Sequence, residues 1–62
     1  MQRIVVLGAG ESGVGAALLA KSKGHDVFVS DFGKIKSMHK QELSQAGIQY
    51  EEFKHTMEYE FA

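Results

Sequence analysis

A short apolar run followed by closely spaced glycines opens this chain. Residues 4–7 read Ile-Val-Val-Leu, and Gly8, Gly10 and Gly13 follow in a G-x-G-x-x-G pattern. Continuous β-branched runs are typical of strands that are covered on both faces of a parallel sheet. Glycines at this spacing permit a sharp turn, a close approach of the backbone to a diphosphate, and tight packing of the next helix on the strand. Because a helix N-terminus presents unpaired N–H groups to anions, the pattern predicts a strand, a phosphate-binding turn and a helix.

Length and composition limit what else the chain can be. A folded chain of 62 residues buries only about 60% of the surface that its unfolded form exposes, and there is no cysteine to form a disulfide. We therefore expect residues 1–62 to form a single partial domain that pairs with another chain or belongs to a larger protein. The net charge of −1 creates no field that would attract nucleic acid or an anionic membrane.

Targeting signals are also missing from the sequence. No apolar run approaches the roughly 20 residues of a transmembrane helix, and the first residues lack the pattern of a signal peptide. We therefore expect a cytoplasmic protein that has neither a membrane nor nucleic acid as a partner.

The rest of the chain alternates between helical and strand patterns. In order, we expect a helix over residues 12–23, a strand over 27–29, a helix over 35–46 and a strand over 48–51. Gly24 and Gly47 suit the positions at which helices end, and Thr56 would start a further helix. The β-α-β-α-β order predicts an α/β, Rossmann-like half fold, with three parallel strands in the order 3-2-1 and the first strand at an edge.

Apolar and histidine positions indicate what is buried. In the first helix the buried face should hold Val14, Ala17 and Leu18, and in the second helix it should hold Ile35, Met38, Leu43 and Ala46. His25, His39 and His55 have neither metal-ligand spacing nor a nucleophile to assist. We therefore predict surface or capping histidines, no metal site and no catalytic residue.

An acid follows the second predicted strand. Ser30 and Asp31 should lie at the carboxyl edge of the sheet, where the glycine turn also lies if the strands are parallel. The Asp31 carboxylate could accept hydrogen bonds from a ribose or a base, or it could be a solvated loop acid. Ser12 could donate its hydroxyl to a phosphate or cap the helix. Glu11 is unfavourable beside a diphosphate unless its side chain points to solvent.

The segment after Asp31 offers weaker candidates. We predict that Lys34, Lys36 and Lys40 form the solvated face of the second helix, with Lys34 close enough to the ligand edge to contact a phosphate. Phe32 could lie against a base or simply close the loop.

Several of these stretches resemble a known family. Residues 5–17, 27–31, 47–52 and 55–56 resemble the N-terminal domain of bacterial UDP-N-acetylmuramoyl-L-alanine:D-glutamate ligases, the MurD family of Mur ligases. In that family the domain is Rossmann-like and holds the UDP part of UDP-MurNAc-L-alanine. The resemblance implies a role in peptidoglycan synthesis, and hence in cell-wall biogenesis, cell shape and cell division. The family's ATP site is a G-x-x-x-x-G-K-[ST] loop in another domain, and this sequence has no such loop. ATP and Mg²⁺ are therefore expected for the parent enzyme, and no cofactor for this chain.

The resemblance also implies a set of binding residues. The UDP site would comprise Gly8, Gly10, Glu11, Ser12, Gly13, Asp31, Phe32 and Gly33. The stretch from Gly10 to Gly13 would meet the diphosphate, and the stretch from Asp31 to Gly33 would meet the uracil. Some relatives carry a hydroxyl residue and an arginine where this chain has Phe32 and Gly33.

The residues also leave other functions open. The same glycines, with Asp31 accepting a ribose 2′-OH, would suit the NAD(P)-binding half of an oxidoreductase. A small nucleotide-sensing module without chemistry is a further alternative. An exposed first strand also predicts a homo-oligomer, either through pairing of two first strands or through a swap of the segment from His55.

Overall fold

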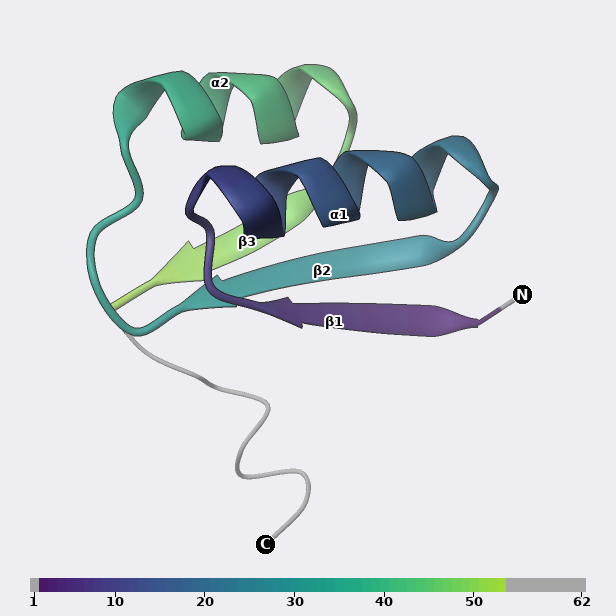
Figure 1. Ribbon diagram of the computed structural model, residues 1–62, viewed down its shortest axis with the longest axis horizontal. Helices are drawn as coiled ribbons and strands as arrows, with labels where there is room; N and C mark the ends of the chain where they lie inside the picture. The colour runs from purple at the N-terminus through teal and green to yellow at the C-terminus, as the bar shows by residue number, and fades with distance from the viewer. Residues whose placement is uncertain (1, 54–62) are drawn as a thin grey trace, which may run out of the picture.

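The chain folds into alternating strands and helices. The computed structural model describes residues 2–53, which contain β1 (Arg3–Leu7), α1 (Glu11–Ser22), β2 (Asp26–Asp31), α2 (Ser37–Gln45) and β3 (Gln49–Glu52). The strands pair in parallel in the order β1-β2-β3, so that β2 is central and β1 lies at an edge (Figure 1). The predicted α/β half fold and its strand order are confirmed. The further helix predicted from Thr56 lies outside the described residues.

The parallel arrangement gathers several chain segments at one edge of the sheet. All strands end at this carboxyl edge, and both helices begin there (Figure 1). The register pairs Leu7 with Ser30 and Asp31 with Glu52. The turn after β1 and the loop after β2 are therefore neighbours, as the sequence predicts.

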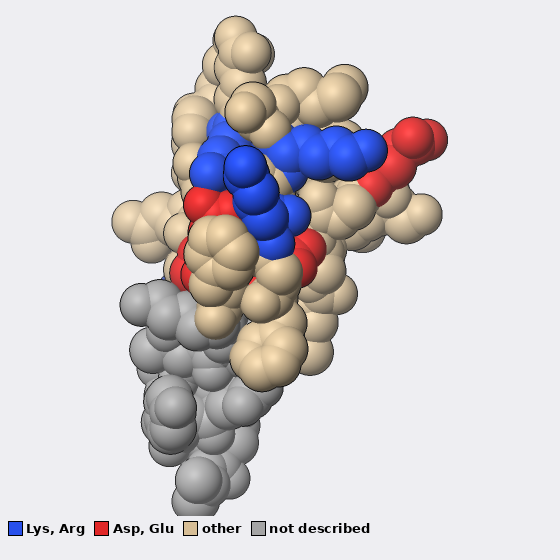
Figure 2. Space-filling view, turned by 90° about the vertical axis from the view of Figure 1, so that its left-hand side faces the viewer, with Lys and Arg blue, Asp and Glu red and all other residues tan. Residues whose placement is uncertain are grey.

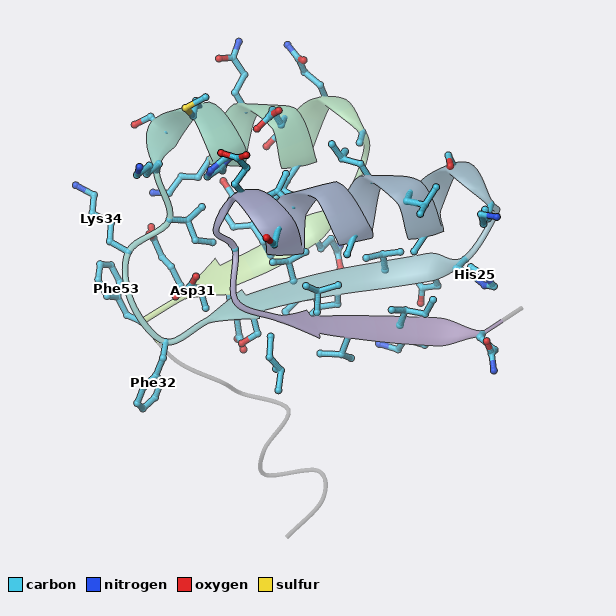
Figure 3. All side chains as sticks on the ribbon, viewed as in Figure 1. His25, Asp31, Phe32, Lys34 and Phe53 are labelled. Carbon is cyan, nitrogen blue, oxygen red and sulfur yellow. The ribbon has the colours of Figure 1, made fainter. Side chains whose placement is uncertain are left out.

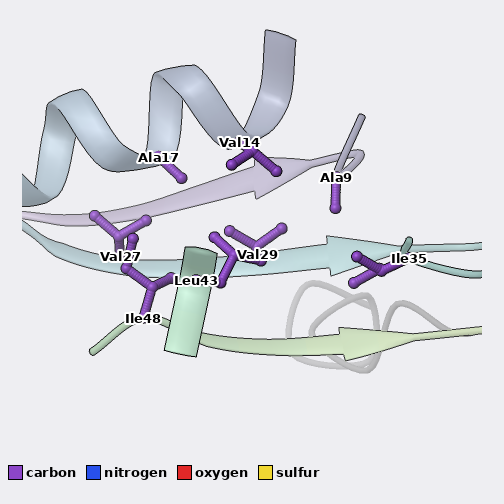
Figure 4. Packing of buried hydrophobic residues seen from close by; sticks show 8 residues of the cluster. All are labelled: Ala9, Val14, Ala17, Val27, Val29, Ile35, Leu43 and Ile48. Carbon is purple, nitrogen blue, oxygen red and sulfur yellow. The ribbon is translucent and has the colours of Figure 1, made fainter. Parts of the chain in front are cut away.

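The core lies between the helices and one face of the sheet. Its buried apolar residues are Ala9, Val14, Ala17, Val27, Val29, Ile35, Leu43 and Ile48 (Figure 4). Val27 and Val29 alternate with the half-buried Phe28, because successive side chains of a strand point to opposite faces. Val14 and Ala17 of α1 pack on them, which confirms the predicted face of the first helix. Each fully buried valine, leucine or isoleucine stabilises the fold by about 1.5–3 kcal/mol.

The predicted buried face of α2 is partly wrong. Met38 is 62% exposed, whereas His39 is only 9% exposed and faces the core together with Leu43. Residues at positions i and i+4 lie on the same face of a helix. His39 is four residues before Leu43 and therefore shares its buried face. The imidazole is tolerated there because its Nδ1 atom lies 2.8 Å from Oε1 of Glu42. The prediction of a surface position for His39 is therefore also wrong.

The sheet is covered on one face by the described residues, not on both faces as the run at residues 4–7 predicts. The chain steps from β1 to β2 and from β2 to β3 in the same direction across the sheet. Because crossovers between parallel strands are right-handed, α1 and α2 lie on the same side of the sheet (Figure 1). Leu7 of β1 is consequently 68% exposed. The exposed edge of β1 is as predicted, and self-association through it stays a prediction.

Candidate functional site

The turn between β1 and α1 contains glycines with different roles. Gly8 has φ +104° and donates its backbone N–H to the carbonyl oxygen of Ser30 at 2.7 Å. A Cβ atom on Gly13 would lie 1.9 Å from the carbonyl oxygen of Gly8, so α1 can approach β1 only if position 13 is glycine. These two glycines shape the turn, as the sequence predicts.

Gly10 differs from these glycines. It is the N-cap residue of α1, with φ −77° and ψ −173°, which is a conformation that any residue can adopt. A Cβ atom on Gly10 would meet nothing within 4 Å. The described part of the chain therefore has no steric need for glycine at position 10, which faces open space at the start of the helix.

Asp31 joins the two loops at the carboxyl edge. Its Oδ2 atom accepts the N–H of Ala9 at 2.7 Å, and its Oδ1 atom accepts the N–H of Gly33 at 2.8 Å. The interpretation of Asp31 as a solvated loop acid is therefore wrong, because its side chain is half-buried and both oxygens are hydrogen-bonded. The bond to Gly33 is the local turn that an aspartate often forms two residues ahead. The bond to Ala9 has no signal in the sequence.

Glu52 fastens the loop after β2 to the sheet. Its Oε2 atom accepts the N–H of Ile35 at 2.9 Å, and its Oε1 atom pairs with the Lys40 ammonium at 2.5 Å. The hydrogen bond with Lys40 and then that with Ile35 hold the pKa of Glu52 below its usual value. The same bond to Glu52 raises the pKa of Lys40. Lys40 is thus half-buried and paired, and the prediction that it lies on a solvated face is wrong.

A cleft of about 230 Å³ lies between the glycine turn and the start of α2. It is lined by Ala9, Gly10, Glu11, Asp31, Lys34, Lys36, Met38 and His39. Lys34 and Lys36 precede α2, so the prediction that they belong to its solvated face is wrong. Figure 2 shows basic side chains gathered on this side of the molecule beside acidic ones. Sequence analysis missed Lys36, Met38 and His39 as cleft residues, since only the fold brings them to the glycine turn.

The remaining predicted site residues lie around this cleft. Ser12 is exposed in the first turn of α1 and does not cap it, because Gly10 is the N-cap and no side chain caps this helix. Glu11 is exposed at the mouth of the cleft. Phe32 is 72% exposed and extends outward from the loop, where Lys34 and Phe53 also extend (Figure 3). Phe32 and Gly33 do not line the cleft.

The other histidine of the described chain is remote from this edge. His25 lies at the opposite end of the sheet (Figure 3). Between residues 2 and 53, no three histidine or acidic side chains are grouped so that they could hold a metal ion. In the same stretch, neither helix is long and apolar enough to cross a membrane.

The fold and the turn define the first half of a doubly wound α/β domain. The family described as the MurD N-terminal domain matches residues 3–60 of the chain. The chain belongs to this family, as the resemblance of its sequence predicts.

Several curated relatives are similar along most of the chain. A protein of Porphyromonas gingivalis is 68% identical over 86% of the chain, one of Bacteroides fragilis 62% over 94%, and one of Christiangramia forsetii 54% over 89%. Each is named UDP-N-acetylmuramoylalanine–D-glutamate ligase. The chain spans only 12–13% of the length of these relatives. No solved structure matches it.

Proposed function

We propose that this chain is the UDP-binding part of a D-glutamate-adding ligase of peptidoglycan synthesis. In this proposal its ligand is the nucleotide end of UDP-MurNAc-L-alanine. The names of the relatives support the ligase, and the open position of Gly10 carries the assignment of the binding site.

The start of α1 would hold the diphosphate. Because Gly10 leaves open space at the N-cap, a phosphate can approach the backbone there and accept the unpaired N–H groups of the first helical turn. The exposed hydroxyl of Ser12 can donate to the same anion. Glu11 contributes its backbone, since its exposed side chain can point to solvent and so reduce charge repulsion.

The loop after β2 would hold the uracil. In this proposal the carboxylate of Asp31, whose oxygens accept the N–H groups of Ala9 and Gly33, also accepts an N–H of the base. The N–H and the carbonyl of Gly33 are already bonded to Asp31 and Phe53. Gly33 therefore shapes the loop, and Phe32 offers its backbone and its exposed ring to the base.

The reaction itself would need parts of the longer ligase. In the longer ligase, ATP with Mg²⁺ would supply the phosphoryl group that activates the substrate carboxylate toward the amine of D-glutamate. The residues of this chain bind and orient the nucleotide, which keeps the rest of the substrate in place for that chemistry.

The oxidoreductase alternative is less well supported. It requires an acid that receives the 2′-OH of a ribose at the end of the second strand. The matching family and the names of the relatives favour the ligase over this alternative.

Replacing Gly10 tests the proposed site. We expect Gly10→Ala to lower the affinity for UDP at least about tenfold, because the added methyl group would occupy the space that a phosphate needs. The stability should change by only a few tenths of a kcal/mol to about 1 kcal/mol, since alanine is a poorer N-cap but meets no atom of the chain. Titration with UDP and urea unfolding would measure the two effects. Unchanged UDP affinity in a folded variant would contradict the proposed site.

A further inference from the structure

Two lysines of the cleft have no role in the site described so far. Lys34 and Lys36 line the cleft from the loop that leads into α2, opposite the glycine turn. Both residues are exposed, and neither forms an ion pair with another described residue. Lys40 differs, because Glu52 holds its ammonium group.

The surroundings of these lysines favour an anion. The cleft borders the N-termini of both α1 and α2, which carry partial positive charge (Figure 1). No side chain caps either helix, and α2 has no acidic residue in its first turn. The acids of the cleft lining are Asp31, whose oxygens accept backbone N–H groups, and the exposed Glu11. Two lysine ammonium groups and the partial positive charge of two helix N-termini therefore border the cleft, against the carboxylates of Glu11 and Asp31.

The size of the cleft limits which part of a ligand it can hold. Sites for whole drug-sized ligands measure roughly 300–1,000 Å³, whereas this cleft measures about 230 Å³. It can accept one part of a sugar nucleotide. The part that matches its charge is the diphosphate, because ammonium groups bind phosphate as point charges.

We propose that Lys34 and Lys36 bind the phosphates of the nucleotide in this cleft and so make the site select a nucleoside diphosphate over a nucleoside. This inference rests on the proposed function. It adds two side-chain contacts, from the loop before α2, to a diphosphate site otherwise built from the backbone of the glycine turn and the hydroxyl of Ser12.

The test compares UDP with uridine on the 62-residue chain. The double variant Lys34→Met/Lys36→Met should lower the affinity for UDP at least about tenfold at low salt and leave the affinity for uridine unchanged. Lys34→Arg/Lys36→Arg should keep most of the UDP affinity, because the charges remain. The matched control is Lys21→Met/Lys23→Met, which removes the same charge at the far end of α1. Circular dichroism would verify that each variant is folded.

The possible outcomes separate the two proposals. Equal losses of UDP affinity in the methionine variant and its control would show a general charge effect and overturn the role of the lysines. UDP affinity that is unchanged in Lys34→Met/Lys36→Met would overturn that role and leave the proposed function standing. A wild-type chain that binds no UDP would overturn both.

Discussion

Gly13→Ala is expected to lower the free energy of unfolding by at least about 3 kcal/mol. The new Cβ atom would lie 1.9 Å from the carbonyl oxygen of Gly8, and a backbone atom cannot move aside as a flexible side chain can. Inserting an extra group into a packed core typically lowers the free energy of unfolding by about 1–3 kcal/mol. A clash with a backbone atom should cause a loss at or above the upper end of that range. A chain of 62 residues has a free energy of unfolding of only about 3–9 kcal/mol. Far-ultraviolet circular dichroism and urea unfolding would measure the loss.

Gly15→Ala is the matched control for this variant. Gly15 lies in the same helix, and a Cβ atom there would meet nothing within 4 Å. The substitution should stabilise the chain by up to about 1 kcal/mol, since alanine is the better helix former. Wild-type stability in Gly13→Ala would show that α1 and β1 are not in the close contact described for them.

Asp31→Ala should have the second-largest effect on stability and should also impair ligand binding. It removes the acceptor for the N–H groups of Ala9 and Gly33, and the bond to Ala9 is partly buried. Because a hydrogen bond to a charged group contributes about 1.5–3 kcal/mol, we expect a loss of at least about 2 kcal/mol. The glycine turn and the following loop would then lose their common anchor, and UDP affinity should fall at least about tenfold.

Asp26 offers a control on the same strand. Its carboxylate forms an exposed ion pair with Arg3 at 3.0 Å, at the other end of β2. Asp26→Ala should cost no more than about 1 kcal/mol, because exposed ion pairs contribute little. If urea unfolding gave equal losses for Asp31→Ala and Asp26→Ala, the anchoring role of Asp31 would be wrong.

Most of the fold could be predicted from local patterns. The buried strand β2, the face of α1 and the glycines that end both helices each leave a signal within a few neighbouring residues. Parallel pairing then follows from the alternation of strands and helices. The prediction for Met38 is wrong because hydrophobicity alone does not decide which face of α2 is buried, and the position in the helix buries His39 instead. The face of the sheet that the described residues leave uncovered was not predictable from the run at residues 4–7, because which faces are covered depends on the side on which both crossovers place their helices.

The site was less predictable, since it depends on contacts between distant segments. The glycine turn and Asp31 were found from their spacing, but the bond between Ala9 and Asp31 joins residues 22 positions apart. Lys36 reaches the cleft only because the loop before α2 folds toward the glycine turn. No periodicity of the sequence encodes such an approach, so the sequence predicts a phosphate contact for Lys34 but not for Lys36.

The central claim is that this site binds a uridine diphosphate compound. It is tested most directly by NMR titration of the ¹⁵N-labelled chain with UDP and, separately, with NAD, following the amides of Gly10, Ser12 and Asp31. We predict that UDP shifts these amides at lower concentrations than NAD. Saturation by NAD at lower concentrations, or amides that UDP leaves unshifted, would contradict the claim.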